Sequence, residues 1–217
     1  DAPLQELVVR AARAFGMDDI AMGDNPVGRI DRLAAAFEQQ KPLLVLDGSP
    51  NEDAAADFVA QCAGATPVLL TADSRLDGPW TPIEVPPLQT DQATALFGLI
   101  SGIEAKDDPG AVSLVGALGG NPLALVIAAA AVKSNPQTPT EFLNAMPQSA
   151  AGAAPAPLLA LTAAFRRLPN ALQGLLLMVG ATFRGQGSAD LLSMISGAPV
   201  EGVNQALGLL VSRHLIE

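Results

Sequence analysis

Residues 41–48 of this chain read Lys-Pro-Leu-Leu-Val-Leu-Asp-Gly. The apolar residues of this stretch form a continuous run and do not alternate with polar ones, which is typical of a strand buried on both faces of a parallel sheet. Asp47 follows at the carboxyl end of this strand. In open α/β sheets that edge is where ligands bind. The stretch therefore indicates an α/β protein with a candidate site at Asp47.

A second apolar run, Pro67-Val-Leu-Leu-Thr-Ala-Asp-Ser-Arg-Leu76, repeats the pattern and places Thr71 at the same edge. We predict adjacent parallel strands over 43–46 and 68–71 at the centre of the core. Their side chains Leu44, Leu46 and Leu69 are expected to be buried.

Helical spacing of apolar residues, punctuated by Gly, Pro and capping residues, continues through the rest of the chain. Helices are predicted over 4–15, 26–37, 51–60, 90–100, 109–118, 122–133, from about 140, and over 158–167, 169–179, 188–195 and 199–212. Thr90 or Asp91 is the expected cap of the helix that starts there. Short strands are predicted at 83–85 and from 214. The Ala- and Pro-rich segment 147–157 indicates a linker.

Composition excludes several classes of protein. Hydrophobic residues make up 49% of the 217-residue chain and charged residues 16%, which argues against global disorder. The net charge of −10 repels phosphate backbones and disfavours nucleic-acid binding. The lone Cys62 forms no internal disulfide, and no signal peptide is visible. The longest apolar run, 123–132, is too short for a bilayer. The expected localisation is cytoplasmic. The absence of an initiator methionine suggests a trimmed chain.

A third motif, Gly119-Gly-Asn-Pro-Leu-Ala-Leu125, follows the two strand motifs in the chain. Together with the two strand motifs it resembles the STAND class of signalling nucleoside triphosphatases, in the NB-ARC-like, bacterial regulator branch. The resemblance implies a partial P-loop NTPase-type parallel sheet over 1–88, a helical lid (ARC1-like) over 89–148 and a winged-helix-like domain over 157–217. The 217 residues contain no Gly-x-x-x-x-Gly-Lys-Ser/Thr, so the phosphate loop of that family is absent from them.

The resemblance assigns conditional roles to residues at the strand ends. Asp47 matches the acid that holds the magnesium shell or orients the attacking water. Thr71 matches a threonine that is followed, after a small residue, by an arginine that senses the terminal phosphate. Asp73 stands where that arginine is expected. Arg75, two residues further on, is therefore the candidate that binds the nucleotide together with Thr71. A carboxylate there repels a phosphate. Gly48 also departs from the second acid or amide that family members often carry.

In the lid motif the resemblance implies that Gly120, Pro122 and Leu123 contact the nucleotide, with the proline ring packed on the adenine base. Pro122 also suits the first position of a helix. The cofactor implied for the intact protein is ADP or ATP with magnesium, and no metal site is expected from this chain's own residues. The implied partners are adenine nucleotide, further copies of the chain, and effector domains. The implied function is a nucleotide-dependent regulatory switch, not hydrolytic as this chain alone.

Two other functions remain open on the residues themselves. Asp47, Asp73 and the Gly119–Gly120 turn could each be an ordinary structural feature, which makes the chain a protein-interaction module without nucleotide chemistry. A DNA-binding regulator is the least favoured alternative. Its candidate recognition helix, over 199–212, carries Glu201 and no cation before Arg213.

Overall fold

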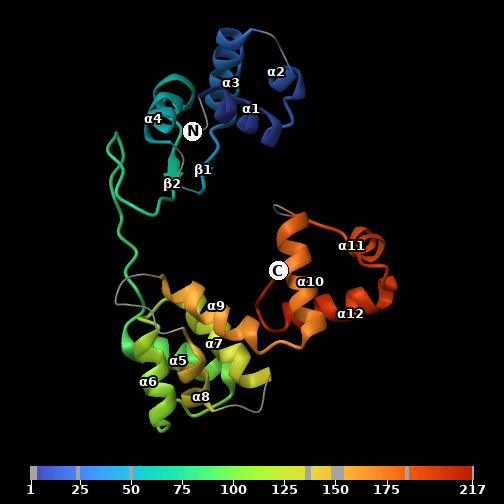
Figure 1. The fold of residues 1–217 in the computed structure, drawn as a ribbon. Helices are drawn as coiled ribbons and strands as arrows, with labels where there is room; N and C mark the ends of the chain where they lie inside the picture. The colour runs from blue at the N-terminus through green and yellow to red at the C-terminus, as the bar shows by residue number, and fades with distance from the viewer. Residues whose placement is uncertain are drawn as a thin grey trace. The chain divides into compact units, whose positions relative to one another are not determined.

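The computed structural model describes residues 4–22, 25–48, 51–134, 138–147, 154–183 and 186–216. These residues are mostly helical, with one small two-stranded parallel sheet. They form two compact units, Asp1–Glu84 and Val85–Glu217 (Figure 1). Among the helices of the described part, none is long and apolar enough to cross a membrane.

The first unit packs helices against one face of the sheet. Its elements are α1 (Leu4–Ala14), α2 (Asp18–Met22), α3 (Pro26–Gln40), β1 (Leu44–Leu46), α4 (Glu52–Phe58), the π-helix η1 (Val59–Ala63) and β2 (Val68–Leu70). Asn25 caps α3 by accepting hydrogen bonds from the N–H groups of Val27 and Gly28, and Asn51 caps α4 by accepting one from Ala54. Local caps of this kind explain why the helix starts agree with the sequence pattern.

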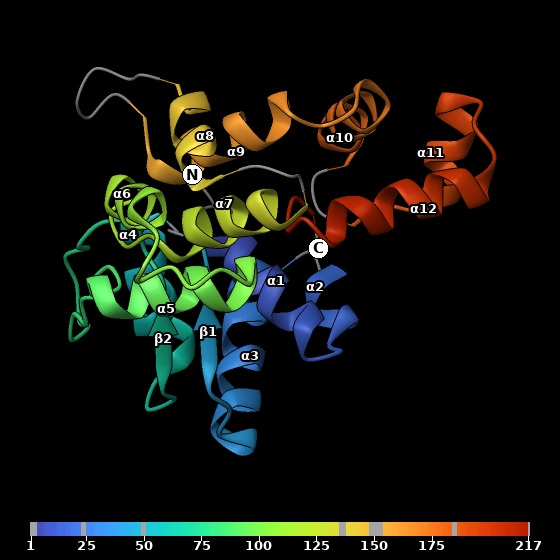
Figure 2. The ribbon, with the colours of Figure 1, turned by 90° about the horizontal axis from the view of Figure 1, so that it is seen from below.

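β1 and β2 lie side by side and parallel, as predicted (Figure 2). Leu44 is buried against the helices, and Leu46 is half-buried on the same face. The opposite face carries Val45 and Leu69, which are paired in register and are 56% and 50% exposed. The expectation that Leu69 is buried was therefore wrong. Side chains alternate between faces along a strand, and within this unit helices cover only one of them.

The second unit is entirely helical in its described residues. Its elements are α5 (Thr90–Ser101), α6 (Pro109–Ala117), α7 (Pro122–Ser134), α8 (Pro139–Ala145), α9 (Ala156–Arg166), α10 (Asn170–Thr182), α11 (Ala189–Ser196) and α12 (Val200–Val211). α7 is buried along most of its length and forms the centre of one hydrophobic cluster with α5, α6, α8 and α9. A smaller cluster joins α10, α11 and α12, and Leu215 packs against both clusters.

Several local predictions require correction. Residues 83–85 form no strand, and Ile83 is 80% exposed. Residues 214–216 are not a strand either, because the N–H groups of His214 and Leu215 donate backward, to the carbonyls of Val211 and Leu210. α5 is preceded by Gln89 as its cap, in place of Thr90 or Asp91. The sequence pattern also missed α2. Most of the predicted linker, residues 148–153, lies outside the described residues.

Candidate functional site

The two polar residues at the strand ends are in direct contact. The register that pairs Leu46 with Leu70 brings the next residues, Asp47 and Thr71, to the same edge. The Thr71 hydroxyl donates to Asp47 Oδ1 at 2.6 Å. It also accepts from the N–H of Gly48 at 3.1 Å. The strand register therefore places the two side chains next to each other, and the short hydrogen bond fixes the orientation of the Asp47 carboxylate.

This pair offers oxygen atoms that can bind a cation, at an exposed position. Asp47 and Thr71 are both exposed, so the carboxylate stays accessible from solvent. Mg²⁺ prefers oxygen ligands, keeps several waters and commonly takes only one or two carboxylates, with phosphates as its remaining ligands. Within the described residues, no group of three or more His, Cys, Asp or Glu could hold a metal by itself. Asp47 therefore suits a magnesium ion that a phosphate ligand brings with it.

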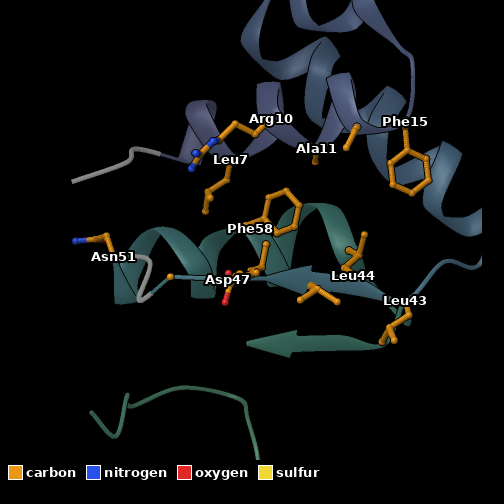
Figure 3. Close-up of a pocket in the computed structure, with 13 residues that line it drawn as sticks. Leu7, Arg10, Ala11, Phe15, Leu43, Leu44, Asp47, Asn51 and Phe58 are labelled. Atoms are coloured by element: carbon orange, nitrogen blue, oxygen red, sulfur yellow. The ribbon is translucent and has the colours of Figure 1, made fainter. Parts of the chain in front are cut away.

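A cavity of about 700 Å³ lies between α1 and β1, beside Asp47. Figure 3 shows Asp47 and Asn51 toward one end of it, and Leu43 and Phe15 toward the other. Its walls are mostly apolar, and Phe58 of α4 contributes to them. The cavity is therefore an apolar trough with a polar end, and the Asp47 carboxylate belongs to that end.

The residues that follow Thr71 do not line the cavity. Asp73 is exposed, and Arg75 is exposed and is not one of the residues that line the cavity. Further along, the N–H of Asp77 donates to the carboxylate of Glu52 at the start of α4. This contact holds the loop beside the carboxyl end of β1.

The Gly119–Leu125 motif forms the turn between α6 and α7. Gly120 has a positive φ of 69°, and a Cβ atom there would lie 2.3 Å from the carbonyl oxygen of Leu88. The N–H of Leu88 donates to the Gly120 carbonyl at 2.9 Å. Asn121 caps α7 by accepting from the N–H of Ala124 at 3.0 Å. Only glycine fits the close approach at position 120.

The turn presents an apolar pair to solvent. Pro122 is the first residue of α7 and is exposed, and Leu123 beside it is 56% exposed. Sequence reasoning missed Leu88 as the partner of Gly120. Its only local signal is an apolar residue directly after Pro86-Pro87.

No known family model matches this chain, and no curated protein matches it significantly. The predicted residues therefore have to be judged by their own geometry. The structure brings Asp47 and Thr71 together in the first unit. It brings Gly120, Pro122 and Leu123 together in the second unit.

The single cysteine does not contribute to this chemistry. Cys62 is buried among the apolar residues of η1, α3 and α4, and its burial raises the pKa of the thiol to about 11. A thiol with so high a pKa stays protonated at neutral pH and is a poor nucleophile. Cys62 is a small core residue.

Proposed function

We propose that this chain is the part of a STAND-type, NB-ARC-like regulatory switch that carries the strand ending at Asp47 (the Walker B strand), the helical lid and the winged-helix-like region. The observation that carries the proposal is the hydrogen bond between Thr71 and Asp47 at the carboxyl ends of two adjacent parallel strands. An acid and a hydroxyl at that edge suit a phosphate-bound cation. The proposed fold of the first unit is accordingly part of a P-loop NTPase-type sheet.

In this proposal Asp47 binds the water shell of Mg²⁺, and Thr71 holds the carboxylate in position. Pro122 and Leu123 supply the apolar surface that covers an adenine base, for which their exposure leaves them available. The phosphate loop would come from a segment upstream of Asp1, and the ligand of the intact protein is ADP or ATP. We place such a switch in the cytoplasm, with effector domains or further copies of the chain as partners.

A specific observation favours a second function. Asp73 is an exposed acid where the phosphate-sensing arginine is expected, and the sheet carries the bare apolar pair Val45 and Leu69. A chain that has lost nucleotide chemistry and kept apolar surface would act as a protein-interaction module. DNA binding has less support, because α12 contains Glu201 and no cation.

Phosphate release and thermal unfolding separate these functions. We expect no ATP hydrolysis by the 217-residue chain, because phosphoryl transfer needs a loop of backbone N–H groups and a lysine around the phosphates. The same protein extended upstream by a strand, phosphate loop and helix should show a higher unfolding temperature with ADP and Mg²⁺. Asp47→Asn should reduce that shift, and Asp53→Asn, an exposed acid on α4, is the matched control.

Hydrolysis by the 217-residue chain that Asp47→Asn abolishes would contradict the first expectation. If the extended protein is folded and no adenine nucleotide shifts its unfolding, the interaction-module function is favoured.

A further inference from the structure

One edge of β1 has no strand beside it in the described part of the chain, and this edge opens into the cavity. The N–H of Leu44 donates to the carbonyl of Pro67, just before β2, at 3.0 Å. The carbonyl of Leu46 accepts from the N–H of Thr71, just after β2, also at 3.0 Å. Backbone groups alternate along a strand, so the N–H and C=O of Val45 face away from β2. All of 43–48 and no residue of β2 line the cavity, with α1 opposite (Figure 3).

Residues 83–85 form an apolar segment that could pair with this free edge. Ile83 and Val85 are 80% and 88% exposed and lie outside any helix or strand. When this segment is extended, the backbone polar groups of Pro82, Glu84 and Pro86 point to one edge. That edge lacks two N–H donors, because proline has no N–H. The other edge, used by Ile83 and Val85, keeps its donors. The segment can therefore pair with a sheet through one edge only.

We propose that residues 83–85 of a second copy of this chain add to β1 as a parallel strand. With Glu84 in register with Val45, the Val45 N–H donates to the Ile83 carbonyl. The Val85 N–H donates to the Val45 carbonyl. Both prolines then face away from β1. An antiparallel strand with Glu84 opposite Val45 would turn both prolines toward β1, where their missing donors are needed. Shifting that strand by one residue turns the prolines away but places Ile83 and Val85 on the open face with Val45, so the parallel direction fits better.

The side chains also fit this register. Residues in register share a face of the sheet, so Ile83 lies beside Leu44 and Val85 beside Leu46, on the face that packs against the helices. Glu84 lies on the open face. Two strongly exposed apolar side chains become buried, and the acid stays in water.

Charge and chain connection favour a second copy as the occupant. Of the described residues that line the trough, only Arg10 and Asp47 are charged, with opposite signs, so an apolar strand suits it. In its own copy the segment follows Asp77, which is held by Glu52 beside the carboxyl end of β1. A parallel strand must enter at the opposite end. Each copy has one free edge and one donor segment, so a reciprocal exchange closes as a two-fold dimer.

Sedimentation of the 217-residue chain across a concentration series at moderate salt tests the proposal. We expect wild type to reach twice the mass of one chain. Val45→Pro removes an N–H that faces the trough and none that faces β2, so it should be monomeric. Ile83→Asp combined with Val85→Asp should also be monomeric, because it removes the apolar donor. Leu99→Asp, at a side chain 81% exposed on α5, is the matched control and should remain dimeric.

Mixing the two monomeric proteins gives the sharpest outcome. The Val45→Pro copy retains a donor segment and the Ile83→Asp, Val85→Asp copy retains a free edge, so the mixture should form a one-to-one dimer. Circular dichroism shows whether each variant keeps its fold. A monomeric wild type at every concentration, a dimer that both variants leave intact, or a mixture that stays monomeric would overturn the proposal.

Discussion

The hydroxyl of Thr71 donates a hydrogen bond of 2.6 Å to the carboxylate of Asp47, and this bond joins the ends of the two parallel strands. The bond depends on register. A shift of either strand by one residue would turn one of the two side chains to the other face of the sheet. The proposed cation site and the strand pairing are therefore one structural feature.

Removal of either partner should show that they are coupled. Thr71→Val should lower the free energy of unfolding by about 0.5–1.5 kcal/mol, the usual net value of a hydrogen bond, with exposure favouring the lower end. Thr71→Ser keeps the hydroxyl and should lose less. Urea unfolding followed by circular dichroism measures the loss. A double-mutant cycle with Asp47→Ala that gives no coupling energy would show that the bond is not formed in solution.

Gly120 should tolerate no side chain. Gly120→Ala places a Cβ atom 2.3 Å from the Leu88 carbonyl oxygen, at a residue whose φ is 69°. We expect a loss of about 1–3 kcal/mol in the stability of the second unit. Gly116→Ala is the matched control, because Gly116 lies in α6 and a Cβ there meets nothing within 4 Å. That change should stabilise by about 0.5–1 kcal/mol. Equal effects of the two changes would contradict the Leu88 contact.

The two faces of the sheet should respond differently to truncation. Leu44 is buried, so Leu44→Ala should cost about 2–5 kcal/mol of stability. Val45→Ala, on the bare face, should change stability by at most about 0.5 kcal/mol in the monomer. Denaturant titration of both variants below the concentration of any dimer checks this. Comparable losses would mean that the face bearing Val45 and Leu69 is covered.

Cys62 should resist alkylation at pH 8 in the folded protein. Burial raises the pKa of its thiol to about 11, so the thiol is protonated well above pH 8, and the reactive thiolate forms only as the pH approaches that value. Mass spectrometry after iodoacetamide treatment should show slow labelling without urea and rapid labelling in urea. Rapid labelling of the folded chain would show that the core around α3 and α4 opens readily.

Local chemistry made much of this fold predictable. Asn25, Asn51 and Asp108 accept hydrogen bonds from the first turns of their helices, and such caps are legible in a few neighbouring residues. The pairing of Asp47 with Thr71 was also predictable, because two apolar runs that each end in a polar residue place those residues at one edge of a parallel sheet.

Features that depend on distant packing were not predictable. The exposure of Leu69 depends on which face of the sheet the helices cover, and the residues around Leu69 do not indicate this. The apolar pattern at 83–85 predicts a strand, but a strand also needs a partner, and in the described structure 83–85 pairs with no strand. The contact between Leu88 and Gly120 joins residues 32 positions apart. No local pattern could have indicated that pairing.

Calorimetric titration of the upstream-extended protein with ADP and with ATP, both with Mg²⁺, is the decisive experiment on the nucleotide-switch proposal. We expect ADP to bind more tightly than ATP, because the Asp73 carboxylate repels the additional phosphate. Asp73→Arg should shift the preference toward ATP, and Pro122→Gly should weaken both nucleotides alike. An absence of binding at millimolar nucleotide, in a protein that circular dichroism shows to be folded, would contradict the nucleotide-switch proposal.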